Sequence, residues 1–257
     1  MTRSTEPGRL AYWMRALGRE DPPAVVEVAG RRLSRVATVK HDFWAAVGFY
    51  EDDRGARVVL KTYRTAPFAG APLRWLGRWQ CRREVGFYRR LAGLACVPAL
   101  LGTVGKTAYL RAYVAGHPLS RERPVPDGFW PRLDAAMREV HLRDVAYVDA
   151  NKPENVLVGD DGRPYLIDFQ IAWGRGRGHG LGQWWLARLQ HADRYHVLKH
   201  KRRFSPDSMT PEELATVRRR SALIRAHRML NRPYLAVRRR LFRWLRRTGR
   251  VLPSGSN

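Results

Sequence analysis

Two charged residues in the first half of the chain, Lys61 and Glu84, have the types and spacing needed to hold a phosphate group. Lys61 ends the β-branched run at residues 56–61, and a lysine at a strand end can reach phosphate oxygens as a compact point charge. Glu84 lies in a helix-like segment at residues 74–91, from which a carboxylate can fix the lysine by an ion pair. Either residue alone is more commonly a solvated surface charge, so the interpretation depends on their partners.

A second set of polar residues, Asp149, Asn155 and Asp168, surrounds a predicted β-hairpin. The Asp-Asp-Gly turn inside residues 156–167 is a strong hairpin signal. Asn155 precedes the first strand and Asp168 follows the second, so both side chains can converge at the open end of the hairpin. Such oxygen ligands suit Mg²⁺. Asp149, in the preceding loop, is placed to orient an attacking hydroxyl and take its proton. The two sets together predict phosphoryl transfer.

The hydrophobic pattern predicts strands in the first part of the chain and helices in the second, which is an α+β fold. The expected strands of the first part are residues 24–28, 33–40, 44–50 and 56–61. The expected helices and the remaining apolar run are residues 74–91, 109–114 and 129–142, followed by mainly helical sequence to about residue 247.

The sequence resembles the protein-kinase-like superfamily over roughly residues 33–200. The most specific segments are Lys-Pro-Glu-Asn-Val-Leu-Val at residues 152–158 and Leu-Ile-Asp-Phe at residues 166–169. The resemblance implies two lobes. Residues 1–113 would form a small antiparallel β-sheet lobe with one helix that binds nucleotide, and residues 114–257 a mainly helical catalytic lobe.

The resemblance also implies a role for each of the five polar residues. Lys61 would bind the phosphates of ATP, and Glu84 would be its partner on the helix. Asp149 would be the catalytic base, while Asn155 and Asp168 would hold Mg²⁺ against the nucleotide. Tyr109–Val114 would connect the lobes beside the adenine, which makes Tyr113 a candidate nucleotide-binding residue.

The phosphate-binding loop departs from the superfamily pattern, because a glycine-rich turn is expected between the first strands. Residues 40–43 stand there and contain no glycine. Lys40 or His41 is expected to contact phosphate in place of the glycine-rich backbone.

The catalytic loop departs as well. Asp149 and Asn155 are six positions apart, where the superfamily has five. One extra residue is therefore expected to bulge at residues 150–151, with Glu154 as the rival base. Gln170 replaces a glycine after the Asp-Phe pair, and no Ala-Pro-Glu motif follows. These losses are closest to RIO-type kinases and to kinases of lipopolysaccharide-core sugars.

The 257-residue chain is strongly basic, with 48 Lys and Arg against 23 Asp and Glu and a net charge of +25. Such a charge attracts polyanions such as glycolipid, anionic membrane or RNA, although GC-rich coding also favours arginine. A basic amphipathic helix is expected at about residues 234–247, either packed on the large lobe, lying on a membrane, or contacting nucleic acid. Residues 193–201 are expected either to line the substrate side of the cleft or to form a basic helix end.

No apolar run of eighteen residues occurs, so no membrane-spanning helix is expected. Two cysteines do not suffice for a disulfide framework. We expect a cytoplasmic protein, with a peripheral position at the inner face of the membrane as the alternative.

These observations favour an Mg²⁺- and ATP-dependent kinase that phosphorylates a hydroxyl, with a sugar or lipopolysaccharide-type glycolipid as acceptor. Two alternatives stay open. One is a RIO-like serine/threonine kinase. The other is a catalytically weak nucleotide-binding scaffold, a pseudokinase on anionic partners.

Overall fold

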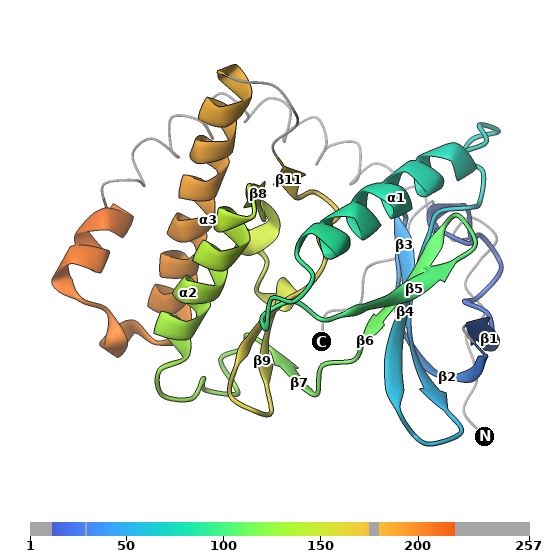
Figure 1. Ribbon diagram of the computed structural model, residues 1–257, viewed down its shortest axis with the longest axis horizontal. Helices are drawn as coiled ribbons and strands as arrows, with labels where there is room; N and C mark the ends of the chain where they lie inside the picture. Colours follow the sequence, from blue (N-terminus) through green and yellow to red (C-terminus); the bar gives the residue numbers. More distant parts are fainter. Residues whose placement is uncertain (1–11, 29, 175–179, 219–257) are drawn as a thin grey trace, which may run out of the picture.

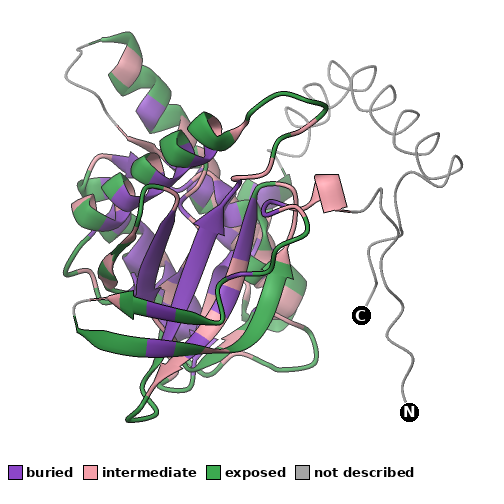
Figure 2. Cartoon of the chain, turned by 90° about the vertical axis from the view of Figure 1, so that its right-hand side faces the viewer, coloured by how far each residue is buried: buried purple, intermediate pink, exposed green. Residues whose placement is uncertain are grey.

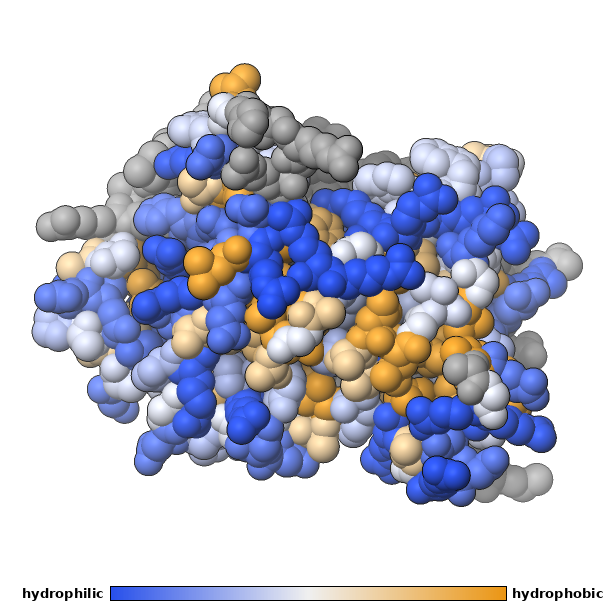
Figure 3. All heavy atoms as spheres, viewed as in Figure 1, coloured by the Kyte–Doolittle hydropathy of each residue, from blue (hydrophilic) through white to orange (hydrophobic). Residues whose placement is uncertain are grey.

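The computed structural model describes residues 12–28, 30–174 and 180–218. The protein has an α+β fold, as the hydrophobic pattern predicts. An antiparallel sheet with one long helix occupies one part of the molecule, and two long helices with a small hairpin occupy the other (Figure 1). Hydrophilic side chains cover most of the face shown in Figure 3, in keeping with the high net charge.

The first part is built on a six-stranded antiparallel sheet with the order β1-β2-β3-β4-β6-β5. Its strands are β1 (Val25–Val28), β2 (Arg31–His41), β3 (Ala45–Asp52), β4 (Arg57–Tyr63), β5 (Leu100–Val104) and β6 (Ala108–Ala112). Strand β4 is buried on both faces from its second residue onward, which its Val-Val-Leu run allows. Strand β2 is mostly exposed, as the burial colours in Figure 2 show.

Helix α1 (Arg74–Arg90) packs against this sheet. Its buried residues recur every three or four positions, the stripe expected of a helix with one packed face. They are Gly77, Gln80, Cys81, Glu84, Val85 and Tyr88. Gly77 permits an unusually close approach, because a Cβ there would lie 2.0 Å from the carbonyl oxygen of Arg64. The helix therefore rests directly on the backbone that follows β4.

The second part contains α2 (Phe129–Leu142) and α3 (Leu181–Phe204), which lie side by side. Strands β7 (Gly116–Pro118), β9 (Val156–Gly159) and β10 (Pro164–Leu166) form a small sheet in the order β10-β9-β7. Strands β8 (Val145–Ala146) and β11 (Trp173–Gly174) form a separate pair. The 3₁₀ helices are η1 (Tyr12–Met14), η2 (Asp149–Asn151), η3 (Pro153–Asn155) and η4 (Pro206–Ser208).

A chain of four buried aromatic rings crosses from the sheet to the second part. Tyr109 of β6 lies 5.4 Å from Tyr88 of α1, measured between ring centroids. Tyr88 lies 5.1 Å from Phe169, and Phe169 lies 5.1 Å from Tyr147. All four rings belong to one hydrophobic core, so the residue after Asp168 is fixed to both parts of the molecule.

The predicted strands and helices agree with the structure to within a few residues where they were expected. Strands β5, β7, β8 and β11 are not predicted by the hydrophobic pattern, because they are short or carry glycine and proline. The basic helix expected at residues 234–247 lies outside the described residues. Among the residues described, no helix is both long and apolar enough to cross a membrane.

Candidate active site

A cavity of about 410 Å³ lies between the sheet and the small hairpin. Apolar side chains of the sheet line one wall, namely Val39, Ala45, Val47, Phe49 and Val59. The opposite wall comes from the segment that includes β9 and the end of the hairpin, namely Glu154, Asn155, Leu157, Ile167 and Asp168. Lys61 and Lys40 also line it, so an apolar slot opens next to a cluster of charges.

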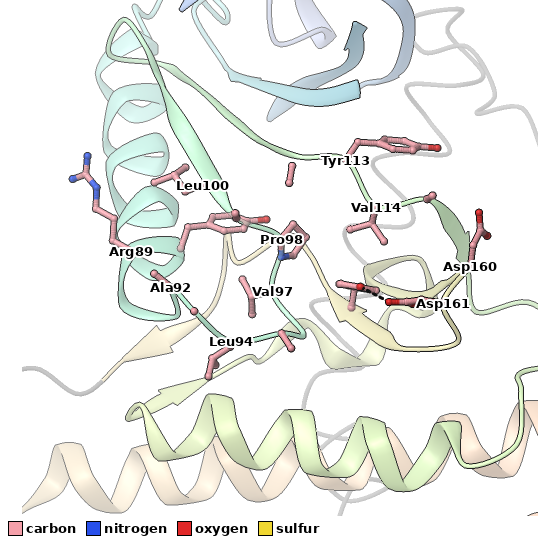
Figure 4. Close-up of a pocket in the computed structure, with 17 residues that line it drawn as sticks. Arg89, Ala92, Leu94, Val97, Pro98, Leu100, Tyr113, Val114, Asp160 and Asp161 are labelled. Carbon is pink, nitrogen blue, oxygen red and sulfur yellow. Dashed lines mark hydrogen bonds between the residues drawn. The ribbon is translucent and has the colours of Figure 1, made fainter. Parts of the chain in front are cut away.

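A second hollow of about 790 Å³ lies behind the connection that follows β6 (Figure 4). Tyr113 and Val114 line both spaces, and Asp160 and Asp161 of the hairpin turn line the second. The larger hollow contains none of the predicted phosphate or metal residues. We therefore take the smaller cavity as the candidate site, because the predicted phosphate and metal residues Lys61, Asn155 and Asp168 line it.

Lys61 is the centre of a buried charge cluster. Its Nζ lies 2.9 Å from Glu84 Oε2 and 2.9 Å from Asp168 Oδ1, so one ammonium joins β4, α1 and the end of the hairpin. Burial alone would lower the pKa of Lys61, but the charges of Glu84 and Asp168 raise it well above its ordinary value. Tyr63 also donates a hydrogen bond to Glu84. The lysine is thus held fully charged at the rim of the cavity.

The hairpin register explains why Asn155 and Asp168 meet. Val156 of β9 pairs with Leu166 of β10, and the N–H of Ile167 donates to the carbonyl of Asn155 at 3.1 Å. The next residue, Asp168, has a positive φ of 64°, a conformation rare outside glycine. Backbone strain of this kind concentrates at functional sites.

Asp168 stays ionised in this position. Burial would raise its pKa, but the charge and hydrogen bond of Lys61, with Lys40 and Lys152 further away, lower it to about 2. Asn155 uses its Nδ2 to donate to Asp149, which leaves its amide oxygen as the atom that can face a cation. One carboxylate and one amide oxygen fit Mg²⁺, which takes few protein ligands and completes its shell with phosphate and water oxygens.

Asp149 is held by two side chains of its own loop. Its Oδ2 accepts hydrogen bonds from Lys152 Nζ at 2.7 Å and from Asn155 Nδ2 at 2.8 Å. Burial raises the pKa of Asp149, and this effect outweighs the opposing influence of Lys152. Residues 149–151, where the bulge is expected, form η2, a 3₁₀ turn. Glu154 lines the cavity, whereas Asp149 is connected to it through the hydrogen bond that it accepts from Asn155.

Asp193 of α3 holds this loop through its backbone, a role that the sequence pattern does not predict. The carboxylate is completely buried and accepts the N–H groups of Tyr147 at 2.7 Å and Val148 at 2.8 Å. It also lies 3.1 Å from His141 Nε2. Val148 has a positive φ of 66°, which is costly for a β-branched residue, so the loop shape depends on these bonds. Residues 193–201 lie within α3, and this segment holds the loop in place.

Two further residues of α3 contact the same loop. His200 is buried and its Nε2 lies 2.7 Å from the carbonyl oxygen of Ala150. Lys199 Nζ donates to Asn151 Oδ1 at 2.6 Å. Two of the three residues of η2 are therefore anchored to α3.

The two residues expected to contact phosphate, Lys40 and His41, lie at the end of β2 and differ in their surroundings. Lys40 lines the cavity, with its Nζ 2.9 Å from Asp42 Oδ2. Of the two alternatives, His41 is not among the residues that line the cavity, because its ring is engaged by Arg15 and Leu17. The Nε2 atom of His41 lies 3.2 Å from the backbone nitrogen of Leu17, and its Nδ1 lies 3.1 Å from Nε of Arg15; the neutral ring accepts one of these two N–H groups.

Tyr113 lies where the sequence analysis expects the nucleotide base. Its ring packs edge-on against Phe49 of β3 at 5.2 Å, and both residues line the cavity. The apolar part of the cavity therefore has an aromatic wall beside the connecting segment.

Lys152 is a second residue whose role the sequence analysis did not assign. A signal was available: the chain has only six lysines among 48 basic residues, and Lys40, Lys61 and Lys152 all lie at this site. Among the described residues, no three His, Cys, Asp or Glu side chains gather in a way that could hold a metal. A metal here would depend on Asp168, Asn155 and the oxygens of a bound phosphate.

No protein-family model matches the chain, and a search of curated proteins finds no match to its sequence.

Proposed function

We propose that the chain is an ATP-dependent kinase with a two-lobed protein-kinase-like arrangement, which transfers the γ-phosphate to a hydroxyl group. The observation that carries the proposal is the convergence of two clusters on one cavity. Lys61, bound to Glu84 and Asp168, lines the cavity, and so does Asn155, which holds Asp149 by a hydrogen bond. These groups come from elements far apart in the sequence, so chance proximity is a poor explanation.

Each cluster has a distinct task in the proposed reaction. The apolar slot beside Tyr113 would take the adenine, and Lys61 and Lys40 would bind phosphate oxygens. Asp168 and Asn155 would hold Mg²⁺, which when bound neutralises charge on the phosphates.

The proton transfer belongs to the loop cluster. Asp149 would accept the proton of the acceptor hydroxyl while the oxygen of that hydroxyl forms a bond to the γ-phosphorus. The bond from that phosphorus to the bridging oxygen breaks, and ADP leaves with the electron pair. Lys152, 2.7 Å from Asp149, would stabilise the charge on the transferred phosphoryl group.

For the acceptor we propose a sugar hydroxyl on an anionic glycolipid, because the net charge of +25 favours a polyanionic partner. A protein substrate of the RIO type is the alternative. A nucleotide-binding scaffold is a second candidate, and one observation favours it. The turn at residues 40–43 has no glycine, and Asp42 fixes it by accepting the N–H groups of Trp44 and Ala45 at 2.8 and 2.9 Å.

Binding and turnover distinguish these candidates. ATP with Mg²⁺ at about 100 times its Kd should raise the melting temperature by roughly 5–10 °C. Asp168→Asn should reduce phosphate transfer at least ~10³-fold without unfolding the protein, because it removes the charged metal ligand. Labelled ATP offered with membranes, ribosomes and soluble extract would identify the acceptor class. Binding without transfer to any acceptor would favour the scaffold, and no thermal shift by ATP would contradict both.

A further inference from the structure

Large apolar side chains project into solvent from three neighbouring segments. On α1, Trp75 is 65% exposed and Trp79, one turn later, is 55% exposed. In the first turns of α3, Leu181 is 87%, Trp184 59% and Trp185 48% exposed. Indole and leucine side chains left in water at this density are a feature of interaction surfaces rather than of ordinary protein exteriors.

Contacts through residues 170–173 make these segments neighbours in the fold. The guanidinium of Arg83 lies 5.6 Å from the Trp79 ring centroid and donates to the carbonyl oxygens of Gln170 and Ala172. The intervening Ile171 is 47% exposed. On the other side, a Cβ at Gly182 of α3 would lie 3.9 Å from the Trp173 ring. Figure 1 accordingly shows β11 between α1 and the first turns of α3.

We call this the tryptophan surface and define it as Trp75, Trp79, Ile171, Leu181, Trp184 and Trp185. Its surroundings are basic. Arg78, Arg82 and Arg188 are exposed beside it, and the guanidinium of Arg188 lies 5.9 Å from the Trp184 ring centroid. A band of hydrophilic side chains accordingly runs along α1 in Figure 3.

Carboxylates are almost lacking on the same helices. Glu84 is the single acid of α1 and Asp193 the single acid of α3, and both are completely buried. Asp144, which pairs with Arg90 at 3.5 Å, is a nearby exposed exception. The partner of this surface must therefore tolerate or require positive charge.

Charge argues against two occupants from the protein itself. Residues 219–257 contain many arginines and no acidic residue, so they would repel the arginines around the tryptophan surface. A second copy of the surface would do the same. The complementary partner is anionic.

The aliphatic members decide between anionic partners. Leu181 and Ile171 gain nothing from contact with the phosphates of a nucleic acid, whereas they can enter the acyl boundary of a bilayer. Tryptophan is enriched at the membrane–water interface, and arginine binds anionic headgroups. We propose that the tryptophan surface docks this protein on anionic phospholipid bilayers. The inference does not depend on the proposed kinase activity.

The test is flotation of the full-length protein with vesicles. Wild type should float with vesicles of phosphatidylcholine and phosphatidylglycerol but not with phosphatidylcholine alone, and binding should weaken as salt increases. The double variants Trp75→Ala/Trp79→Ala and Trp184→Ala/Trp185→Ala should each lower vesicle affinity at least ~10-fold, a loss of about 1.4 kcal/mol. Their melting temperatures should stay near wild type, because the side chains are exposed.

Val36→Ala is the control. Val36 is 55% exposed but lies on β2, which β3 separates from β4 in the sheet, and its loss should leave vesicle binding unchanged. Unchanged binding by both tryptophan double variants would overturn the proposal. A second outcome would overturn it too. If truncation after Arg218 abolishes vesicle binding and the tryptophan substitutions do not change it, binding belongs to residues 219–257. A third outcome would also overturn it. If RNA displaces wild type from vesicles but does not displace the tryptophan double variants, the tryptophan surface binds nucleic acid instead.

Discussion

The two charge clusters beside the cavity differ in how their cations are exposed to water. Lys61, Glu84 and Asp168 are closed on one another, and Glu84 is completely buried. Asp149 and Lys152 form a pair that is open on the side of its cation: the Lys152 side chain is 49% exposed, while that of Asp149 is 8% exposed. The pKa of Asp168 falls to about 2, while that of Asp149 is raised. The closed cluster keeps fixed charges, whereas in the open one the raised pKa of Asp149 suits this carboxylate to take a proton from a substrate.

Asp149→Asn should separate these two roles with the largest effect. The variant keeps the hydrogen bonds of the loop but cannot accept a proton, so kcat should fall at least ~10²-fold. ATP affinity should stay nearly unchanged, because Lys61 and Asp168 are intact. Steady-state kinetics on the identified acceptor would check this. Near-normal turnover would contradict the assignment and direct attention to Glu154.

Asp193→Asn should affect the support of the open cluster. One of the two oxygens that accept backbone N–H groups becomes an NH₂, which leaves a buried donor unpaired. We expect a loss of about 1–3 kcal/mol in the free energy of unfolding together with a fall in kcat. Urea unfolding measures the first effect. Asp207→Asn, at an exposed position of η4, is the matched control and should change neither.

Glu84→Gln should weaken the closed cluster without abolishing it. Lys61 keeps Asp168 as a charged partner, and a glutamine can still accept from Tyr63. The KM for ATP should rise by about tenfold, the loss of roughly 1.4 kcal/mol, with a smaller change in kcat. If kcat alone falls, Glu84 acts on the transition state rather than on nucleotide binding.

His41 provides the smallest effect and marks the edge of the site. Burial, followed by the charge of Arg15, lowers its pKa from 6.5 to about 4. The unfolded chain therefore takes up a proton at higher pH than the folded one, and stability should decline as pH falls from 6.5 to 4. His41→Gln should make the melting temperature less dependent on pH across this range and leave turnover unchanged. An altered KM for ATP would instead place His41 in the site.

The parts of the fold that sequence predicted best are those with local signals. The Val-Val-Leu run of β4, the periodic apolar stripe of α1 and the turn of the β9–β10 hairpin each identify their element without reference to the rest of the chain. The hairpin also predicted that Asn155 and Asp168 would lie together, since pairing fixes both ends.

The missed features depend on tertiary contacts. Strands β8 and β11 have two residues each and exist only as partners of each other. Asp193 looks like any acid in a basic helix until the folded chain places it under Tyr147 and Val148. The rarity of lysine is a further sequence signal, because four of the six lysines in this arginine-rich chain, at residues 40, 61, 152 and 199, lie beside the cavity or its loop.

Gly77 has a consequence for how this protein tolerates variation. It lies seven residues before Glu84, two turns along the same buried stripe of α1. Any side chain at position 77 would meet the backbone of Arg64 and push the helix outward, carrying Glu84 away from Lys61. A substitution that touches neither the cavity nor a charged group would then be selected against as strictly as a change in the site itself, and homologues that keep the lysine–glutamate pair should keep a glycine there.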